Sequence, residues 1–228
     1  NDICFVINRG KEMIPQYFED MPELERELKK RGKLHMLKEL SRYHNVNFHV
    51  VYQDEMLGDG HALLLAREWV ESANVAILFG DDLIMGKENG LQQITQALGY
   101  LKNPAETVML CLQKVPRALV SRYGIVAIDR AWQKHSPEKR LRKVTALIEK
   151  PAPAKAPSNL GIVGKYIVPK SIFEKLHQIE EGSYGEIRLI DALIAEQDRI
   201  DIYGCVFEGK RLDTGTPEGY KEAVKAFG

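Results

Sequence analysis

Strand-like and helix-like segments alternate along most of this chain, and this order constrains the fold more than any other feature of the sequence. The strand-like segments are continuous apolar runs, such as residues 75–79 (VAILF) and 107–113 (TVMLCLQ). Strands of this kind are buried on both faces, which requires helices on both sides of the sheet. Segments with helical periodicity lie at 21–40, 60–70, 90–101, 185–197 and 216–227. The sequence therefore predicts a three-layer α/β/α fold around a mostly parallel mixed central sheet.

The rhythm of the chain changes after its first half, where strands follow one another without a long helix between them. Residues 123–129 and 143–149 predict a pair of strands joined by a segment rich in Lys and Arg. We expect one domain over residues 1–228, made of two parts, 1–115 and 116–228.

Composition and charge narrow the possible classes of protein. Lys+Arg and Asp+Glu both number 32, so the formal net charge is zero, which argues against a dedicated nucleic-acid binder. No apolar run is long enough to cross a bilayer, and the chain does not open with a signal pattern. Cys4, Cys111 and Cys205 lie in apolar strand-like segments and lack metal-site spacing. We therefore expect a cytoplasmic protein with reduced cysteines in its core.

Polar side chains follow several predicted strands at the point where each strand ends. These residues are Gln53, Asp81, Asp82, Glu149, Lys150 and Asp213. In open α/β sheets, ligands bind outside the carboxyl ends of the strands. The sequence therefore predicts a polar site at one edge of the sheet.

Each of these motifs also has a purely structural interpretation. Asp81-Asp82 and Asp213 are common turn residues, and Glu149-Lys150 can be a solvated pair. Gly58 and Gly60 are too few for a dinucleotide fingerprint. The sequence contains no Gly-x-Ser-x-Gly motif, so it gives no support to a serine hydrolase.

The motifs gain meaning when they are taken together and in order. They are Gln53 with Gly58-Asp59-Gly60-His61-Ala62, Gly80-Asp81-Asp82, Tyr123-Gly124, Glu149-Lys150-Pro151, Pro157-Ser158-Asn159-Leu160, Gly185-Glu186-Ile187 with Asp191, and Asp213-Thr214-Gly215. This series resembles the bacterial UTP–glucose-1-phosphate uridylyltransferases, also called UDP-glucose pyrophosphorylases, among the sugar-phosphate nucleotidylyltransferases. The resemblance covers essentially the whole chain, including residues 7–20 (INRGKEMIPQYFED).

The resemblance implies a Rossmann-like nucleotidyltransferase fold and a reaction between UTP and glucose 1-phosphate that gives UDP-glucose and pyrophosphate. The sugar phosphate attacks the α-phosphorus in line, so the protein acts by positioning and charge neutralisation. By the same resemblance, Asp81 and Asp213 hold Mg²⁺, an ion that takes one or two protein carboxylates. Asp82 is then expected to support the turn. The family also implies a homo-oligomer, a dimer or a tetramer.

Further positions on the nucleotide side are carried over from the family. Gln53 reads the uracil edge, because an amide offers both a donor and an acceptor. Gly58 lets the backbone approach the base, and Asp81 also serves the nucleotide. Residues 1–115 then form the nucleotide-binding part and residues 116–228 the sugar-binding part.

On the sugar side, the resemblance assigns Gly124 to a backbone contact and Glu149 to the glucose hydroxyls. Lys150 meets the sugar phosphate, where its point charge offsets the anions, and Val163 lines the sugar pocket. Asp81 and Lys150 are the expected catalytic residues. The loops near the site are expected to be fixed by Asn159 and Glu186.

The sequence also departs from the family. The glycine-rich loop with an Arg and a Lys that cradles the triphosphate in the family has no counterpart here. We expect the sequence to be part of a longer protein, and a chain without that loop to be catalytically weak until the segment is restored.

Other functions remain open at this point. Asp213-Thr214-Gly215 is closer to the thymidylyltransferases, and a catalytically silent sugar-nucleotide-binding domain is a further possibility. A glycosyltransferase would be expected to carry an Asp-x-Asp pair, which is absent around Asp81.

Overall fold

The computed structural model describes residues 2–179 and 185–228. The chain divides into two compact units: unit 1 is 1–71 with 180–188, and unit 2 is 72–179 with 189–228. The division expected near residue 115 therefore lies inside unit 2.

Unit 1 is built on a pair of parallel strands, β1 (Asp2–Ile7) and β2 (Asn47–Tyr52). Its helices are α1 (Met13–Gln16), α2 (Pro22–Lys30), α3 (Leu34–Leu40) and α4 (Asp59–Leu65), with short 3₁₀ turns at Ser41–Tyr43 and Arg67–Trp69. Rings of Phe5, Phe18 and Phe48 stack with centroids 5.0–5.7 Å apart. This aromatic cluster joins the two strands to the segment after α1.

The single long helix expected over residues 21–40 is two helices in the structure. The break comes at Gly32, whose φ of +67° is left-handed and favours glycine. Because a left-handed residue cannot continue an α-helix, α2 ends before Gly32 and α3 begins after it.

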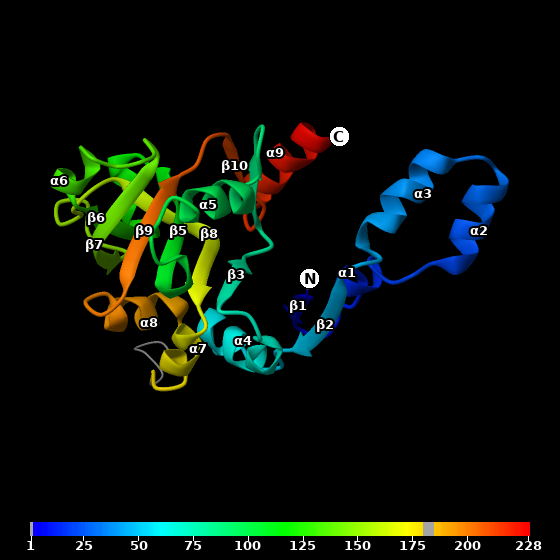
Figure 1. The fold of residues 1–228 in the computed structure, drawn as a ribbon, viewed down its shortest axis with the longest axis horizontal. Helices are drawn as coiled ribbons and strands as arrows, with labels where there is room; N and C mark the ends of the chain where they lie inside the picture. The colour runs from blue at the N-terminus through cyan, green and yellow to red at the C-terminus, as the bar shows by residue number, and fades with distance from the viewer. Residues whose placement is uncertain (1, 180–184) are drawn as a thin grey trace. The chain divides into compact units, whose positions relative to one another are not determined.

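Unit 2 contains the main sheet, with strands in the order β3-β8-β5-β9-β7-β6 (Figure 1). The strands are β3 (Asn74–Leu78), β5 (Thr107–Lys114), β6 (Gly124–Ile128), β7 (Leu141–Glu149), β8 (Leu160–Pro169) and β9 (Asp201–Val206). The helices are α5 (Gly90–Leu98), α6 (Arg130–Gln133), α7 (Ser171–Leu176), α8 (Leu189–Glu196) and α9 (Pro217–Phe227), with 3₁₀ turns at Pro104–Glu106 and Arg117–Arg122.

The expected α/β class with a mixed central sheet is confirmed, but most strand pairs of this sheet are antiparallel. Among the described residues, β5–β9 is its only parallel pair, whereas β3–β8, β5–β8, β6–β7, β6–β8 and β7–β9 are antiparallel. Continuous apolar runs are typical of parallel strands because both faces are covered. In this sheet helices cover both faces of antiparallel strands as well, so the same runs occur there.

Helices cover both faces of the unit 2 sheet. Ile94, on α5, packs with Val163 on β8 in a fully buried cluster that also includes Cys111. Ile162, the neighbour of Val163, lies on the opposite face, where its Cδ1 and that of Ile190 on α8 approach Gly124. The three-layer arrangement therefore holds within unit 2.

A separate two-stranded antiparallel ribbon, β4 (Asp82–Met85) with β10 (Lys210–Asp213), also belongs to unit 2. Each strand has only four residues. The ribbon matters for function because it pairs Asp82 directly with Asp213. No helix in the described part of the chain is both long and apolar enough to span a membrane.

Candidate functional site

Asp81 and Asp213 come together at one end of the β4–β10 ribbon. The register pairs Asp213 with Asp82, so Asp81 lies just beyond the paired residues. The backbone N–H and the hydroxyl of Thr214 both donate to the carbonyl oxygen of Asp81, at 2.8 and 3.0 Å. These two hydrogen bonds hold the two aspartate-bearing turns against each other.

The carboxylates of Asp81 and Asp213 converge over Gly215. A Cβ on Gly215 would lie 2.8 Å from Asp81 Oδ2 and 3.3 Å from Asp213 Oδ1. The hydrogen of glycine therefore leaves open a small space bordered by two anionic oxygens. Two carboxylate oxygens beside open space suit a hard divalent cation, which completes its shell with water and phosphate oxygens. The residues fit the metal that the family implies.

Within the described ranges, no group of three or more His, Cys, Asp or Glu side chains is arranged to hold a metal ion. The two-carboxylate arrangement is thus incomplete as an all-protein metal site. It fits an ion that shares its ligands with a bound phosphate.

Asp82 has a different environment from that of Asp81. Its side chain is buried, and Oδ2 accepts the backbone N–H of Gly164 at 2.8 Å. Oδ1 pairs with Nε of Arg211, and the carbonyl oxygen accepts from Nζ of Lys165. Burial lowers the pKa of Lys165, and the nearby Asp82 carboxylate opposes that shift. Asp82 thus anchors the ribbon to β8.

Arg211 is a residue of this site that the sequence reasoning missed. Its Nη2 donates to Asp213 Oδ2 at 3.2 Å and its Nη1 to Tyr123 Oη at 3.2 Å. Burial tends to lower the pKa of Arg211, but the hydrogen bond and charge of Asp82 raise it above its ordinary value. A signal was present in the sequence, because residues i and i+2 of a strand share a face, which places Arg211 beside Asp213.

The sugar-side residues Gly124 and Glu149 are register partners of β6 and β7. A Cβ on Gly124 would lie 3.2 Å from Glu149 Oε2 and 3.3 Å from Ile162 Cδ1. Glu149 Oε1 is 3.4 Å from Nζ of Lys150, whose side chain is 59% exposed. The structure therefore brings Gly124, Glu149 and Lys150 together.

Lys150 has a strained backbone. Its φ of +44° is the only positive value of a non-glycine residue among those that the structure describes. The following residue, Pro151, adds a second restriction, since a residue before proline prefers an extended conformation. Left-handed non-glycine residues cost roughly 1–3 kcal/mol and are concentrated at functional sites. The backbone N–H of Lys150 donates to the carbonyl oxygen of Tyr123 at 3.1 Å, which fixes the turn.

Val163 requires a correction as a residue expected to line the sugar pocket. Its side chain is 2% exposed and lies in the core cluster under α5. Because adjacent residues of a strand point to opposite faces, Ile162 is the side chain that approaches Gly124. The Ile162 side chain, and not that of Val163, is therefore the one that lies beside Gly124.

The residues that the family resemblance assigns to the base, Gln53 and Gly58, lie in unit 1. Nε2 of Gln53 is 2.9 Å from the carbonyl oxygen of Gly58 and 3.2 Å from Nδ1 of His61. Gly58 has a φ of +95°, and a Cβ there would lie 2.5 Å from the carbonyl oxygen of Ile187, so only glycine fits. These contacts hold the side-chain amide of Gln53 against the loop of Gly58 and His61.

Two loop residues expected near the site have local structural contacts. The side-chain amide of Asn159 donates to the carbonyl oxygen of Val115 at 3.3 Å. Glu186 adjoins Gly58, since its Cβ is 3.1 Å from the position of a Cβ on that glycine.

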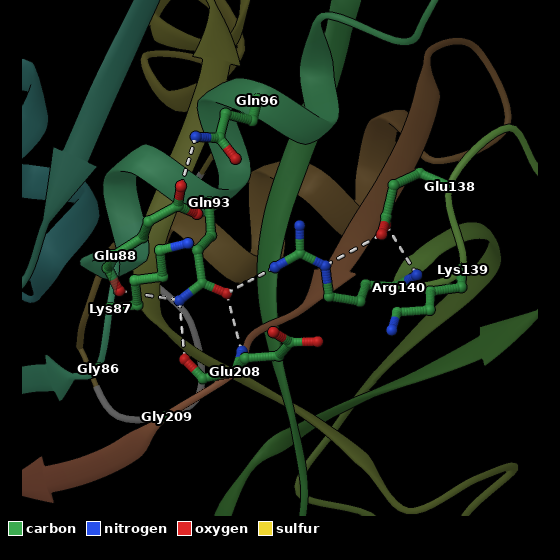
Figure 2. Close-up of a pocket in the computed structure, with 10 residues that line it drawn as sticks. All are labelled: Gly86, Lys87, Glu88, Gln93, Gln96, Glu138, Lys139, Arg140, Glu208 and Gly209. Carbon is green, nitrogen blue, oxygen red and sulfur yellow. Dashed lines mark hydrogen bonds and ion pairs between the residues drawn. The ribbon is translucent and has the colours of Figure 1, made fainter.

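A cavity of about 400 Å³ lies at the other end of the β4–β10 ribbon, away from Asp81 and Asp213 (Figure 2). Its lining comprises Gly86, Lys87, Glu88, Gln93, Gln96, Glu138, Lys139, Arg140, Glu208 and Gly209. Gln93 is 1% exposed and hydrogen bonds both N–H and C=O of Glu208. The Arg140 guanidinium bonds Gln93 and Glu138. The polar groups drawn there largely satisfy one another, and none of the predicted site residues lines the cavity.

Comparisons with known proteins find relatives that match almost the whole chain. The model of the nucleotidyl transferase family matches residues 3–227. A UTP–glucose-1-phosphate uridylyltransferase of Bacillus subtilis (strain 168) is 34% identical over 227 residues, which are 99% of this chain and 74% of that protein. A protein of the same name from Pseudomonas aeruginosa is 32% identical over 98% of this chain and 78% of its own length.

Solved structures give the same result. UTP-bound UDP-glucose pyrophosphorylase from Acinetobacter baumannii matches with a TM-score of 0.81 and 30% identity, over 100% of this chain and 77% of that one. A UDP-glucose pyrophosphorylase complexed with UDP-glucose matches with a TM-score of 0.79 and 28% identity, over 100% of this chain and 80% of that one.

Proposed function

Since the chain belongs to the nucleotidyl transferase family, in the group of the UTP–glucose-1-phosphate uridylyltransferases, we propose that it transfers the uridylyl group of UTP to glucose 1-phosphate. The products are UDP-glucose and pyrophosphate. One observation carries the proposal beyond the similarity: Asp81 and Asp213 converge on the space that Gly215 leaves open.

We take the divalent cation of this site to be Mg²⁺, held by Asp81 and Asp213. When bound, it neutralises charge on the phosphate oxygens and so favours in-line displacement at the α-phosphorus. An oxygen of the sugar phosphate forms the new P–O bond as the bond to pyrophosphate breaks. No covalent intermediate with the protein is required, and the chain supplies positioning and charge.

On the sugar side, Glu149 accepts hydrogen bonds from glucose hydroxyls and Gly124 leaves room for the ring. Lys150 offsets the charge of the sugar phosphate. Its strained backbone and its exposed ammonium support this role. Ile162 supplies an apolar contact beside Gly124.

In unit 1, Gln53 reads the base through Oε1, which accepts the N3–H of uracil. Cytosine carries an acceptor at N3 and would meet that oxygen without a hydrogen bond. Thymine keeps the N3–H, so this contact alone does not separate UTP from dTTP. Gly58 and its close approach to Ile187 shape the loop next to the amide.

Turnover and binding should be measured side by side to test the proposal. UDP-glucose formation is followed from UTP and glucose 1-phosphate with Mg²⁺, and dTTP, CTP and ATP are compared. Binding of UDP-glucose, dTDP-glucose, ADP-glucose and UDP-galactose is measured by calorimetry. We expect UDP-glucose to bind best, and Asp81→Asn and Asp213→Asn to lower both activity and metal-dependent binding by at least about 100-fold.

Asp198→Asn is the matched control, because Asp198 is an exposed carboxylate outside the site. It should behave as the wild type. Equal binding of all four sugar nucleotides, or unchanged binding in both aspartate variants, would contradict the proposed function.

A further inference from the structure

The guanidinium of Arg211 joins three side chains of unit 2. Nε pairs with Asp82, Nη2 with Asp213 at 3.2 Å, and Nη1 with the hydroxyl of Tyr123 at 3.2 Å. The Arg211 side chain is only 13% exposed. Its Cζ lies 5.6 Å from the centre of the Tyr123 ring, so the aromatic face also restrains it.

We propose that Arg211 is a positioning residue that orients Asp213 toward the divalent cation, a role that rests on the proposed function. Oδ2 of Asp213 accepts from Arg211, whereas Oδ1 accepts the backbone N–H of Gly215 at 3.2 Å and lies beside the space over that glycine. Without Arg211, the carboxylate would keep, among the described residues, only the Gly215 N–H as a partner of its two oxygens, and its orientation would be less restricted. Arg211 itself does not contact the cation.

The charges near the ribbon end support this role. Asp81, Asp82 and Asp213 place three carboxylates close together before any substrate phosphate arrives. Arg211 offsets the two that it contacts, and it leaves Asp81 without that partner. Of the two carboxylates expected to bind the cation, Asp213 is therefore held by Arg211 and Asp81 is not.

The fork of the guanidinium is essential to this arrangement. It directs three N–H groups at fixed angles to three different oxygens, whereas a lysine ammonium at the end of a flexible stem cannot span them. An Arg211→Lys variant keeps the charge but loses the simultaneous contacts. The charge and the geometry of Arg211 can therefore be tested separately.

Tyr123 extends the arrangement toward the sugar-side residues. Its hydroxyl accepts from Arg211, while its backbone carbonyl accepts the N–H of Lys150 at 3.1 Å. Tyr123 also directly precedes Gly124. Tyr123 thus links Arg211, through its hydroxyl, to the turn of Lys150, through its backbone carbonyl.

Mn²⁺ binding provides a readout that does not depend on turnover. The dissociation constant of Mn²⁺ is measured by electron paramagnetic resonance with saturating UDP-glucose, for wild type, Arg211→Lys and Tyr123→Phe. We expect Arg211→Lys to weaken Mn²⁺ binding at least about tenfold, and Tyr123→Phe about threefold, because one of three anchors is lost. Arg199→Lys is the matched control, since Arg199 is 70% exposed, and it should bind Mn²⁺ as the wild type does.

Circular dichroism melting shows whether each variant folds. If Arg211→Lys does not fold, the Mn²⁺ affinity of Tyr123→Phe tests the proposal, since this variant removes only the hydroxyl that contacts Arg211. Wild-type Mn²⁺ affinity in the folded variants would overturn the positioning role. That result would leave the proposed function intact if the wild type forms UDP-glucose. If the wild type forms no UDP-glucose, the proposed function fails, whatever the Mn²⁺ affinity of the variants.

Discussion

At the scale of single residues, the site depends on the lack of a Cβ atom at Gly215 as much as on the side chains around this glycine. The Cβ position of Gly215 lies between the carboxylate oxygens of Asp81 and Asp213. The Asp-Thr-Gly motif was visible in the sequence, and so were both aspartates. That the glycine hydrogen keeps the space between them open could be learned only from the structure.

Gly215→Ala is therefore expected to remove metal-dependent UDP-glucose binding. The added methyl group would lie 2.8 Å from Asp81 Oδ2 and occupy the space over the two carboxylates. We expect UDP-glucose to bind at least about tenfold more weakly with Mg²⁺ by calorimetry, with little change in the melting temperature. Gly80→Ala is the control, because a Cβ there meets nothing within 4 Å. Equal binding by wild type and Gly215→Ala would place the cation elsewhere.

At the scale of elements, the sequence predicted several long segments correctly, but it joined α2 and α3 into one helix and missed the shortest strands. The strand β5 and the helices α5 and α9 lie where the apolar runs and the helical periodicity placed them. The ribbon of β4 and β10 was missed because each strand has four residues and begins or ends at an aspartate. Arg211 went unnoticed for the same reason, since its role depends on that pairing.

Helix α5 offers a test of local sequence signals. Asn89 forms a reciprocal capping box with Gln92, with both hydrogen bonds at 2.9 Å. Asn89→Ala should lower the free energy of unfolding by about 1 kcal/mol in urea titrations, because the first-turn N–H groups lose their acceptor. Asn103→Ala is the control, since Asn103 makes no side-chain cap bond at its 3₁₀ turn. Equal losses in the two variants would show that capping is not the cause.

At the scale of the whole molecule, most of the buried hydrophobic side chains of the described residues belong to unit 2, where β5 has six consecutive buried residues. The sequence predicted the α/β class and that both faces of the sheet are covered. The strand directions could not be read from the apolar runs, because helices cover both faces of antiparallel strands here as well. The sequence also did not predict that residues 185–188 belong to a unit formed mainly by residues before 72.

Two core thiols make the stability of the fold sensitive to alkaline pH. Burial raises the pKa of Cys111 to about 12 and that of Cys205 to about 11, from an ordinary value of 9.0. Below pH 9 both states of the protein keep these protons, whereas above it the unfolded chain loses them first. The free energy of unfolding should therefore fall from about pH 9 upward, by up to roughly 1.4 kcal/mol per pH unit for each thiol.

Urea titrations at pH 8, 9 and 10 measure this slope. Replacement of both cysteines by alanine should flatten it, while Cys4→Ala should change it less because Cys4 is only partly buried. A slope that is the same in the double variant and the wild type would assign the alkaline loss to other groups.

The left-handed backbone at Lys150 has a consequence for selection. A thermal-stability screen of random variants should favour glycine or asparagine at this position, since both relieve the strain. A screen for UDP-glucose formation should instead retain lysine. The two screens would then select different residues at position 150. The residue found at this position therefore indicates whether selection acted on activity or on stability.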